Sequence, residues 1–442
     1  MFSKKLLIVF SFIATVTLIY SCTHDELTDY DKALHLTIGE KDKYLLPDGK
    51  DLSQIPQSPE NPLTDAKIKL GKLLFFEPVF GNESKRFDQK FTYTCSSCHV
   101  VEAGFRPARM QGIADGGFGF GIKGERREKY PFYASTEIDA QGARPLALLN
   151  VAYVENTMWN GSFGSEGINI GTEGMWGVFD PSTKINEQRL GALEGQNIEG
   201  LITHRMMYNK ELIKAAGYDK LFDEAFPNMS EEEKYSRKGA SFALSAYIRS
   251  ILTNEAPFQN WLKGDKYAMS ENEKHGATLF FGKAGCVGCH FEKNLGSMRF
   301  EALGVDDLYE HGGLNTGPND RRNLGRAGFT DNAEDMFKFR TPQLYNLEDS
   351  GPYFHGGSMQ TLEEVVRYFN NGKKQNQRVS DDQLAPYIKP LNLSEEEVLA
   401  LTAFIANGLR DPNLLRYKPT SVLSGLCFPN NDLASKIDMN CK

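Results

Sequence analysis

Two short runs of identical spacing, at 95–99 and 286–290, constrain this chain more than any other feature. Each run reads Cys-x-x-Cys-His, a spacing typical of covalent attachment of a c-type haem. One turn of backbone brings both sulfurs to the porphyrin edge for thioether bonds, while the adjacent histidine reaches the iron. The predicted ligands are Cys95, Cys98 and His99 for the first haem and Cys286, Cys289 and His290 for the second.

Other interpretations of these two runs account for less of the pattern. Paired Cys-x-x-Cys knuckles of a zinc site usually lie about 15–20 residues apart, whereas 188 positions separate Cys98 from Cys286. A thioredoxin-type dithiol needs a βαβ context, which neither run has, and needs no histidine. A disulfide within each run would be strained. The pattern therefore favours two haems.

The N-terminus indicates export. Lys4 and Lys5 precede an apolar run, 6–20, that is too short to span a membrane comfortably. The run ends in Ile-Tyr-Ser before Cys22, the order of a bacterial lipobox, in which Cys22 becomes the lipidated first residue. The alternative is an ordinary signal peptide with a cysteine nearby. Because each buried acyl methylene contributes about 0.8 kcal/mol, a multiply acylated Cys22 would hold the protein on a membrane. The expected location is the periplasmic side of the cell envelope.

Composition and the remaining cysteines agree with an exported protein. The net charge is −8 and no basic block occurs, so nucleic acid is not an expected partner. Of seven cysteines, four would hold haem and one lipid. Cys427 and Cys441 remain, and an oxidising compartment lets them pair. The loop of about 15 residues that they close would stabilise the fold by roughly 3 kcal/mol in the chain-entropy model.

Helical patterns dominate the chain. Thr64 suits an N-cap before an amphipathic helix over 64–76, and 240–252 predicts an apolar helix. The pattern Gly-x-x-Leu-Phe-Phe occurs at 71–76 and again at 276–281, ahead of each haem motif, which argues for two related domains. Capping boxes predict three further helix starts, at Ser270 with Glu273, Thr361 with Glu364, and Ser394 with Glu397.

The predicted fold is mainly α, with two c-type cytochrome-like haem domains in tandem and long Gly-rich loops. No long alternating apolar run suggests a sheet. A Gly-rich stretch over 105–145 is expected to cover the first haem, since long loops in compact domains are usually functional or disordered. A composition break at 228–238 suggests a domain boundary. The expected parts are a lipoprotein signal peptide (1–21), a tether and docking arm (22–60), an N-terminal haem domain (61–230), a C-terminal haem domain (231–415) and a tail (416–442).

Taken together, the motifs over about 60–412 resemble the bacterial di-haem cytochrome c peroxidase family, which includes MauG-like enzymes. The resemblance implies that the N-terminal haem is the peroxide site and that the C-terminal haem passes electrons to it. Besides the haem motifs, it rests on residues 70–78, 148–153, 159–161, 339–344, 351–355 and 361–366.

The resemblance also implies roles for single residues. Gln196 matches a distal Gln of the peroxide pocket, and Trp159 matches a Trp near the path between the haems, although core packing is its alternative role. A calcium ion is expected between the domains, because oxygen ligands suit calcium. Its matching positions are Asn150, Ser350 and Pro352.

Two departures from the family pattern concern the sixth ligands of the irons. Many members carry a His in the loop after the first motif, which caps the iron at rest. Residues 100–144 contain no His, and Met110 is their only Met, so we expect an open, high-spin haem at His99. Where the family places a Met or Tyr ligand for the second haem, this chain has Phe369, which leaves Met359 or Tyr368 as candidate sixth ligands.

The acid–base residue is open between two candidates. Many members place a Glu about ten residues beyond the distal Gln. Here His204 is the nearest match in a shorter loop, with Glu199 as the alternative. A lone His is more often a structural residue, but its place after Gln196 supports a catalytic role.

The resulting hypothesis is an exported di-haem c-type peroxidase that reduces hydrogen peroxide to water with electrons passed through the C-terminal haem. The alternatives are a MauG-like oxidase of a protein or organic substrate, and a di-haem electron carrier without peroxidase turnover. Expected partners are hydrogen peroxide, a small electron-donor protein or quinol-linked donor, and a membrane through the lipid anchor. A homodimer is compatible with these expectations.

We predict that the mature protein carries two covalent haems, because both sulfurs and the proximal His occur twice. Mass spectrometry of the intact protein should show two haem additions. A mass that corresponds to one haem or none would refute the assignment of the motifs.

We also predict that Cys22→Ser moves the protein from the membrane fraction to the soluble fraction, since it removes the acylated side chain. Fractionation followed by immunoblotting measures this. An unchanged membrane fraction would contradict the lipobox assignment.

Overall fold

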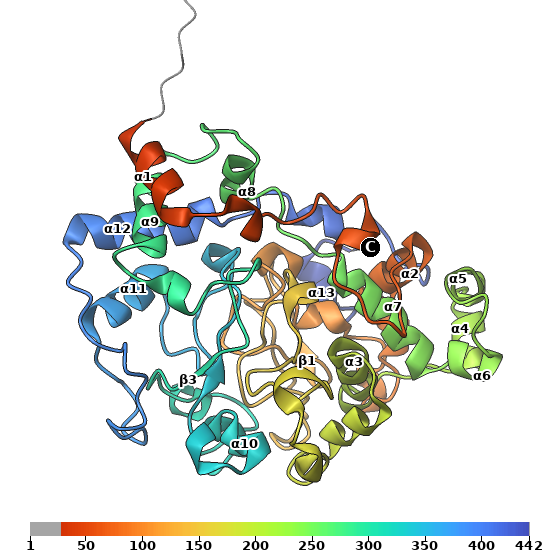
Figure 1. Ribbon diagram of the computed structural model, residues 1–442. Coiled ribbons are helices and arrows are strands. Elements are labelled where there is room, and N and C mark those ends of the chain that lie inside the picture. Colours follow the sequence, from red (N-terminus) through yellow and green to blue (C-terminus); the bar gives the residue numbers. More distant parts are fainter. Residues whose placement is uncertain (1–27, 442) are drawn as a thin grey trace, which may run out of the picture.

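The computed structural model describes residues 28–441, so the predicted signal peptide and Cys22 lie outside the described residues. The fold is mainly α, as predicted, with two small antiparallel sheets of two strands each, β1–β2 and β3–β4 (Figure 1). The helices are α1 (Asp29–Ile38), α2 (Asp65–Phe75), α3 (Ala192–Thr203), α4 (Lys210–Ala215), α5 (Asp219–Ala225), α6 (Glu231–Lys234), α7 (Arg237–Arg249), α8 (Pro257–Leu262), α9 (Glu271–Phe281), α10 (Ala327–Thr330), α11 (Leu362–Asn371), α12 (Glu395–Ala403) and α13 (Leu433–Asp438). The strands are β1 (Gly117–Phe118), β2 (Glu128–Lys129), β3 (Phe300–Glu301) and β4 (Phe339–Arg340).

The helix starts follow the capping signals in the sequence. The Thr64 side chain accepts a hydrogen bond from the backbone N–H of Lys67 at the start of α2. All three capping boxes form, at the first turns of α9, α11 and α12. A side chain that satisfies an otherwise unpaired N–H at a helix start stabilises the helix by about 1 kcal/mol.

Two hydrophobic cores organise the chain. The first is built on α2, α3, α5 and α7, and the second on α1, α8, α9, α11 and α12. Figure 1 shows α1, α9, α11 and α12 gathered on one side of the molecule and α2 to α7 on the other. Helix α1 falls in the stretch expected to be a tether and docking arm, and it packs on α9 through Leu34 and Ile38.

The division between the cores differs from the composition break at 228–238. Helix α7 begins within that break and packs against α2 and α3, so the first core extends to Ile251, beyond the expected boundary at 230/231. The physical reason is that the polar stretch forms α6, a short surface helix that leads into an apolar helix of the same core.

The repeated Gly-x-x-Leu-Phe-Phe pattern marks the closest helix crossing in each core. A Cβ at Gly71 of α2 would lie 1.9 Å from the carbonyl oxygen of Ala243 in α7. A Cβ at Gly276 of α9 would lie 2.0 Å from the carbonyl oxygen of Ala400 in α12. Both distances are far below van der Waals contact, so only glycine allows these helices to approach so closely. The repeated pattern therefore provides the same close, glycine-dependent helix contact in both cores.

The C-terminal tail returns to the first core. Val422 is buried in it, and Cys427 and Cys441 form the disulfide predicted from the cysteine count. The tail covers the back of the first haem motif, where the Thr94 hydroxyl donates to the Pro429 carbonyl at 3.0 Å. Asp438 accepts hydrogen bonds from two backbone N–H groups in the Gly-rich loop, at 2.9 and 3.0 Å. The tail thus fixes that loop in place.

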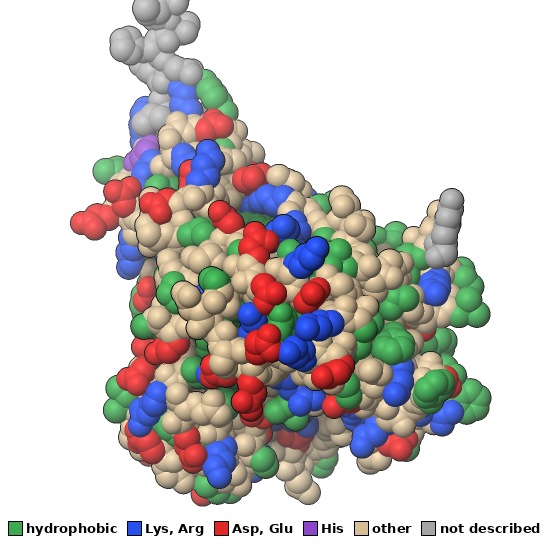
Figure 2. Space-filling view, turned by 90° about the vertical axis from the view of Figure 1, so that its right-hand side faces the viewer, with side chains coloured by type: hydrophobic (Ala, Val, Ile, Leu, Met, Phe, Trp, Pro, Cys, Tyr) green, Lys and Arg blue, Asp and Glu red, His purple; other side chains and the backbone are tan. Residues whose placement is uncertain are grey.

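The surface carries both signs of charge. On the face in Figure 2, acidic and basic side chains are interspersed, in keeping with a net charge of −8 and no basic block in the sequence. Within residues 28–441 the structure contains no helix of the length and apolar character needed to cross a bilayer.

The close crossing of α9 and α12 predicts that Gly276→Ala destabilises the protein. The added methyl collides with the Ala400 backbone, and overpacking of this kind costs about 1–3 kcal/mol or more, which outweighs the roughly 1 kcal/mol by which alanine favours a helix. Denaturant unfolding of the haem-loaded protein measures the loss. Gly317→Ala is the matched control, since a Cβ there meets no atom within 4 Å. Equal stability of the two variants would contradict the packing argument.

Candidate functional site

One continuous cavity of about 1050 Å³ is lined by both Cys-x-x-Cys-His motifs. Its wall includes Cys95, Cys98 and His99 from the first motif and Cys286, Cys289 and His290 from the second. The volume lies at the upper end of the usual 300–1,000 Å³ for small-molecule pockets, as expected of a space that accommodates two prosthetic groups. The structure therefore brings the two predicted haem sites together.

The two motifs have the same local geometry. In each, the backbone N–H of the histidine donates a hydrogen bond to the carbonyl oxygen of the first cysteine, at 3.1 Å for His99 and 3.0 Å for His290. The His99 Nδ1 lies 3.1 Å from the carbonyl oxygen of Phe105, and the His290 Nδ1 lies 2.8 Å from that of Leu295. Such a bond fixes the ring orientation and leaves Nε2 free for a metal. Both imidazoles could therefore hold a haem iron through Nε2.

The cavity wall keeps these side chains in their neutral forms. Desolvation raises the pKa of the Cys95, Cys98 and Cys286 thiols to about 12. It lowers the pKa of His99 and of His290 to about 4. A redox dithiol instead needs a thiol whose pKa is depressed, and a metal-binding imidazole must be unprotonated. These environments favour haem attachment over dithiol chemistry.

The cavity wall contains three buried arginines, and their charges indicate which kind of group the cavity can hold. Arg106, Arg144 and Arg340 are 5%, 0% and 6% exposed, and none forms an ion pair with a carboxylate of residues 28–441. Nη2 of Arg106, and Nε and Nη1 of Arg144, have no hydrogen-bond partner. Burial lowers the pKa of Arg106 and of Arg340 to about 10. Because a buried charge is costly unless it is paired, this cluster calls for anions, which the propionate carboxylates of haem supply.

Polar side chains gather on the wall near His99. His204 caps the C-terminal end of α3, and its Nδ1 lies 2.8 Å from Oδ2 of Asp139, a carboxylate in the Gly-rich loop. Burial lowers the pKa of His204, but the Asp139 charge and hydrogen bond more than offset that, so its pKa is raised. Gln196 and Glu199 line the same cavity from α3, and burial raises the pKa of Glu199. All three predicted residues therefore line the cavity that His99 also lines.

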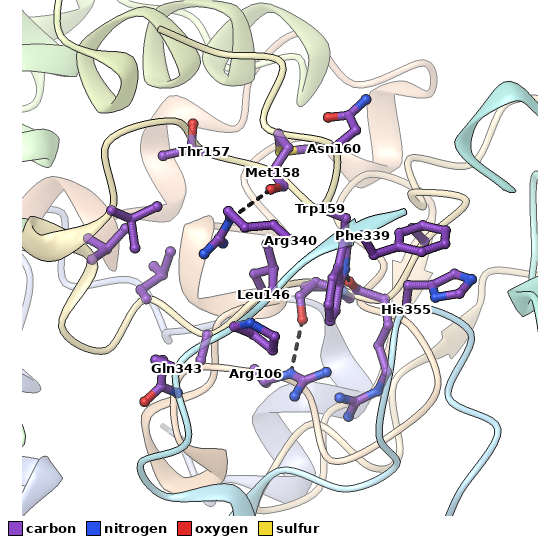
Figure 3. A pocket seen from close by; sticks show the side chains of 18 of the residues that line it. Arg106, Leu146, Thr157, Met158, Trp159, Asn160, Phe339, Arg340, Gln343 and His355 are labelled. Carbon is purple, nitrogen blue, oxygen red and sulfur yellow. Dashed lines mark hydrogen bonds between the residues drawn. The ribbon is translucent and has the colours of Figure 1, made fainter. Parts of the chain in front are cut away.

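Trp159 lines the cavity that both motifs share. Its indole N–H donates to the Arg144 carbonyl at 2.7 Å, and its ring contacts Phe339 and His355 edge to face, with centroids 6.4 and 6.3 Å away. Figure 3 shows these three rings side by side, with Arg340 extending past them toward Met158. Trp159 therefore packs in the wall of the cavity that both motifs share.

The candidate sixth ligands of the second haem require a correction. Neither Met359 nor Tyr368 lines the cavity, and the Tyr368 hydroxyl donates to the Leu303 carbonyl instead. Phe369 occupies the cavity face of α11. Consecutive residues of a helix point about 100° apart, so Tyr368 is directed away when Phe369 faces the cavity.

Two of the three positions expected to hold calcium, Asn150 and Ser350, already have protein partners. The Asn150 amide is already used: its Oδ1 accepts from the Thr253 N–H at 3.0 Å, and its Nδ2 donates to the Thr253 hydroxyl at 2.7 Å. The carbonyl of Ser350 accepts from the Arg144 guanidinium at 2.8 Å, and so does the carbonyl of Gly351, which precedes Pro352. A calcium ion on these oxygens would lie against a buried positive charge. The expectation of calcium is therefore not supported, and within residues 28–441 no cluster of three or more acidic, His or Cys side chains offers another metal site.

The loop after the first motif does not bring its methionine to the cavity. Met110 is absent from the lining and lies against Gly357. The loop side chains that do reach the cavity include Arg106, Asp139 and Gln141.

Sequence reasoning missed Asp139 and the arginine cluster. Asp139 lies 65 positions from His204, with no spacing that links them. For the arginines, the signal in the sequence is weak: Arg144 lies four residues before the matched stretch 148–153, but its burial and its lack of a carboxylate partner emerge only from the fold.

The comparisons agree with this site. The family model for di-haem cytochrome c peroxidase matches residues 65–267. A cytochrome-c peroxidase IdrP1 from Denitromonas iodatirespirans is 27% identical, covering 80% of this chain and 84% of the relative. The methylamine utilization protein MauG from Methylorubrum extorquens is 28% identical, covering 81% and 82%.

Solved structures show the same fold. A MauG-like protein associated with microbial copper homeostasis has a TM-score of 0.55 and 23% identity, covering 84% of this chain and 95% of that one. The diheme peroxidase BthA from Burkholderia thailandensis has a TM-score of 0.51 and 17% identity, covering 85% and 91%. With two haem motifs on one cavity, a family model that matches residues 65–267 and relatives along most of its length, the chain is similar to the di-haem cytochrome c peroxidases, MauG-like proteins included, and is an oxidoreductase of the cytochrome-c peroxidase type.

Proposed function

We propose that this protein reduces hydrogen peroxide to water at the haem held by His99, with electrons that arrive through the haem held by His290. The observation that carries this proposal is the His204–Asp139 pair on the cavity wall beside His99. A base with a raised pKa in that position suits proton transfer within a bound peroxide. The relatives named as cytochrome-c peroxidases support the same reaction.

The haem iron supplies coordination of the peroxide and the path for two electrons, which the protein itself cannot provide. His204 takes the proton from the inner peroxide oxygen through Nε2, because Nδ1 faces Asp139, and delivers it to the outer oxygen. Asp139 holds the ring in that orientation and favours the protonated form during transfer. Gln196 orients the peroxide from the preceding turns of α3. Two electrons and two protons convert one peroxide into two waters.

The rest of the wall supports electron delivery. Trp159 lines the cavity that both motifs share, and its indole N–H donates to the Arg144 carbonyl. We propose that this ring shortens the path between the two haems. The buried guanidinium groups of Arg106 and Arg144 would neutralise the charge of the haem propionates. This pairing would fix the positions of the haems and therefore the path of the electrons between them.

The cellular setting is part of the proposal. Lipidation at Cys22 would hold the protein on the periplasmic side of a membrane, where a small electron-donor protein or a quinol-linked donor reaches it. The interspersed charges in Figure 2 allow an electron-donor protein to dock through local pairs of opposite charge. Such docking does not need one large surface region of a single charge. A homodimer remains compatible with the fold.

We predict that the fully oxidised protein reacts with peroxide without prior reduction and that His204→Ala slows the reaction about 100-fold or more, within the range typical of lost acid–base catalysis. Stopped-flow spectra of the haem-loaded protein measure the rate. Glu199→Gln is the control on the same helix, and its rate should stay close to wild type. A wild-type protein that is inert until partly reduced, or a larger loss with Glu199→Gln, would contradict the assignment.

The pH profile separates proton transfer from a merely structural role. Only neutral His204 accepts a proton, so the rate should fall as pH drops through its pKa, which lies above the ordinary 6.5. Asp139→Asn keeps a hydrogen-bonding side chain but removes the charge, so the fall should move to lower pH. An unshifted profile in Asp139→Asn would show that this pair does not carry the proton.

A further inference from the structure

The cavity face of α11 carries no group that can bind iron. Leu362, Val365, Val366 and Phe369 line the cavity, at positions i, i+3, i+4 and i+7 of one helical face. Each ends in carbon only. The wall beside His99 differs, since it offers an imidazole, a carboxylate and an amide.

This apolar face belongs to the second haem motif. Val365 and Val366 pack in the same core as Cys286 and Phe280, and the Phe280 ring lies 6.3 Å from the His290 ring. The surrounding cavity wall continues the apolar surface with Leu391, Leu401 and Ile405. The surface that faces the second motif from α11 and α12 is therefore hydrocarbon throughout.

The side chains nearby that could bind iron are committed elsewhere. Tyr368 donates to the Leu303 carbonyl, and Tyr353 donates to the Leu347 carbonyl at 2.9 Å. His355 holds Asp307 through Nε2 at 2.9 Å and stacks on Phe339 with centroids 3.7 Å apart. Met359 is 5% exposed and does not line the cavity.

Tyr387 is the one cavity-lining hydroxyl near the motif that needs a direct test. It lies with Cys289, Glu301 and Arg299, beside the cysteine that would carry the porphyrin edge, and not on the α11 face. Its hydroxyl contacts Glu301 and Cys289.

We propose that the haem at His290 keeps a vacant coordination position opposite that histidine and binds small neutral diatomic molecules there, of the class of carbon monoxide, nitric oxide and dioxygen. A neutral diatomic molecule loses little on entering a hydrocarbon pocket, whereas an anion or a ligand that needs hydrogen bonds would be left unsatisfied. The α11 face also offers no base that could move a proton within a bound peroxide. This inference rests on haem attachment at 286–290 and not on peroxide turnover at His99.

The test is a titration of the fully reduced, haem-loaded, full-length protein with carbon monoxide, followed by optical and infrared spectra. We expect two carbon monoxide molecules per chain. Phe369→Met introduces a thioether that can bind iron, so its ferrous protein should show one additional low-spin haem before the gas is added, and should bind one molecule fewer. Tyr387→Phe, Tyr368→Phe and Met359→Leu are controls that should leave the wild-type count unchanged.

Each outcome decides the proposal. Two molecules per chain support it. If the wild type binds one, the variant resolves which haem is open: a fall to zero in Phe369→Met supports the proposal, and a count that stays at one overturns it. No binding by the wild type, or a count that rises in one of the controls, also overturns it. Peroxide reactivity is measured separately, so failure here does not depend on the outcome at His204.

Discussion

The close approach of paired helices is the constraint on which the rest of the structure depends. Gly71 lies on the Ala243 carbonyl and Gly276 on the Ala400 carbonyl, which sets the distance between α2 and α7 and between α9 and α12. Each pair forms one side of a hydrophobic core, and each glycine-bearing helix leads toward a haem motif. A bulkier residue at either crossing would push the helices apart and change the shape of the cavity between the cores.

The cavity that results is chemically unequal at its two ends. The Gly-rich loop and α3 bring Asp139, His204 and Gln196 to the His99 end, whereas α11 and α12 present hydrocarbon to the His290 end. Between them, buried arginines without carboxylate partners create a demand for anions that haem propionates meet. With haem at both motifs, this difference in local dielectric and in the supply of proton acceptors would favour proton-coupled chemistry at the His99 end.

The C-terminal tail links the first motif to its loop. Pro429 meets Thr94 behind the haem motif, and Asp438 holds backbone N–H groups of the Gly-rich loop. The disulfide between Cys427 and Cys441 closes the tail on itself. Positions far apart in the sequence therefore fix the loop that supplies Asp139, which explains why a loop rich in glycine can hold a charged residue in a defined place.

The sequence by itself determined the haem attachment sites, the helical class, the helix starts and the tail disulfide, because each depends on residue types at short spacing or on the number of cysteines. It also placed His204 and Glu199 near Gln196, since α3 carries Gln196 and Glu199 and ends at its cap His204. Only the tertiary structure decided that Asp139 pairs with His204, that Arg144 contacts the Ser350 carbonyl expected to hold calcium, and that Phe369 rather than Tyr368 faces the cavity. These outcomes depend on how distant segments pack and on the rotation of one helix about its axis, and neither is encoded in local spacing.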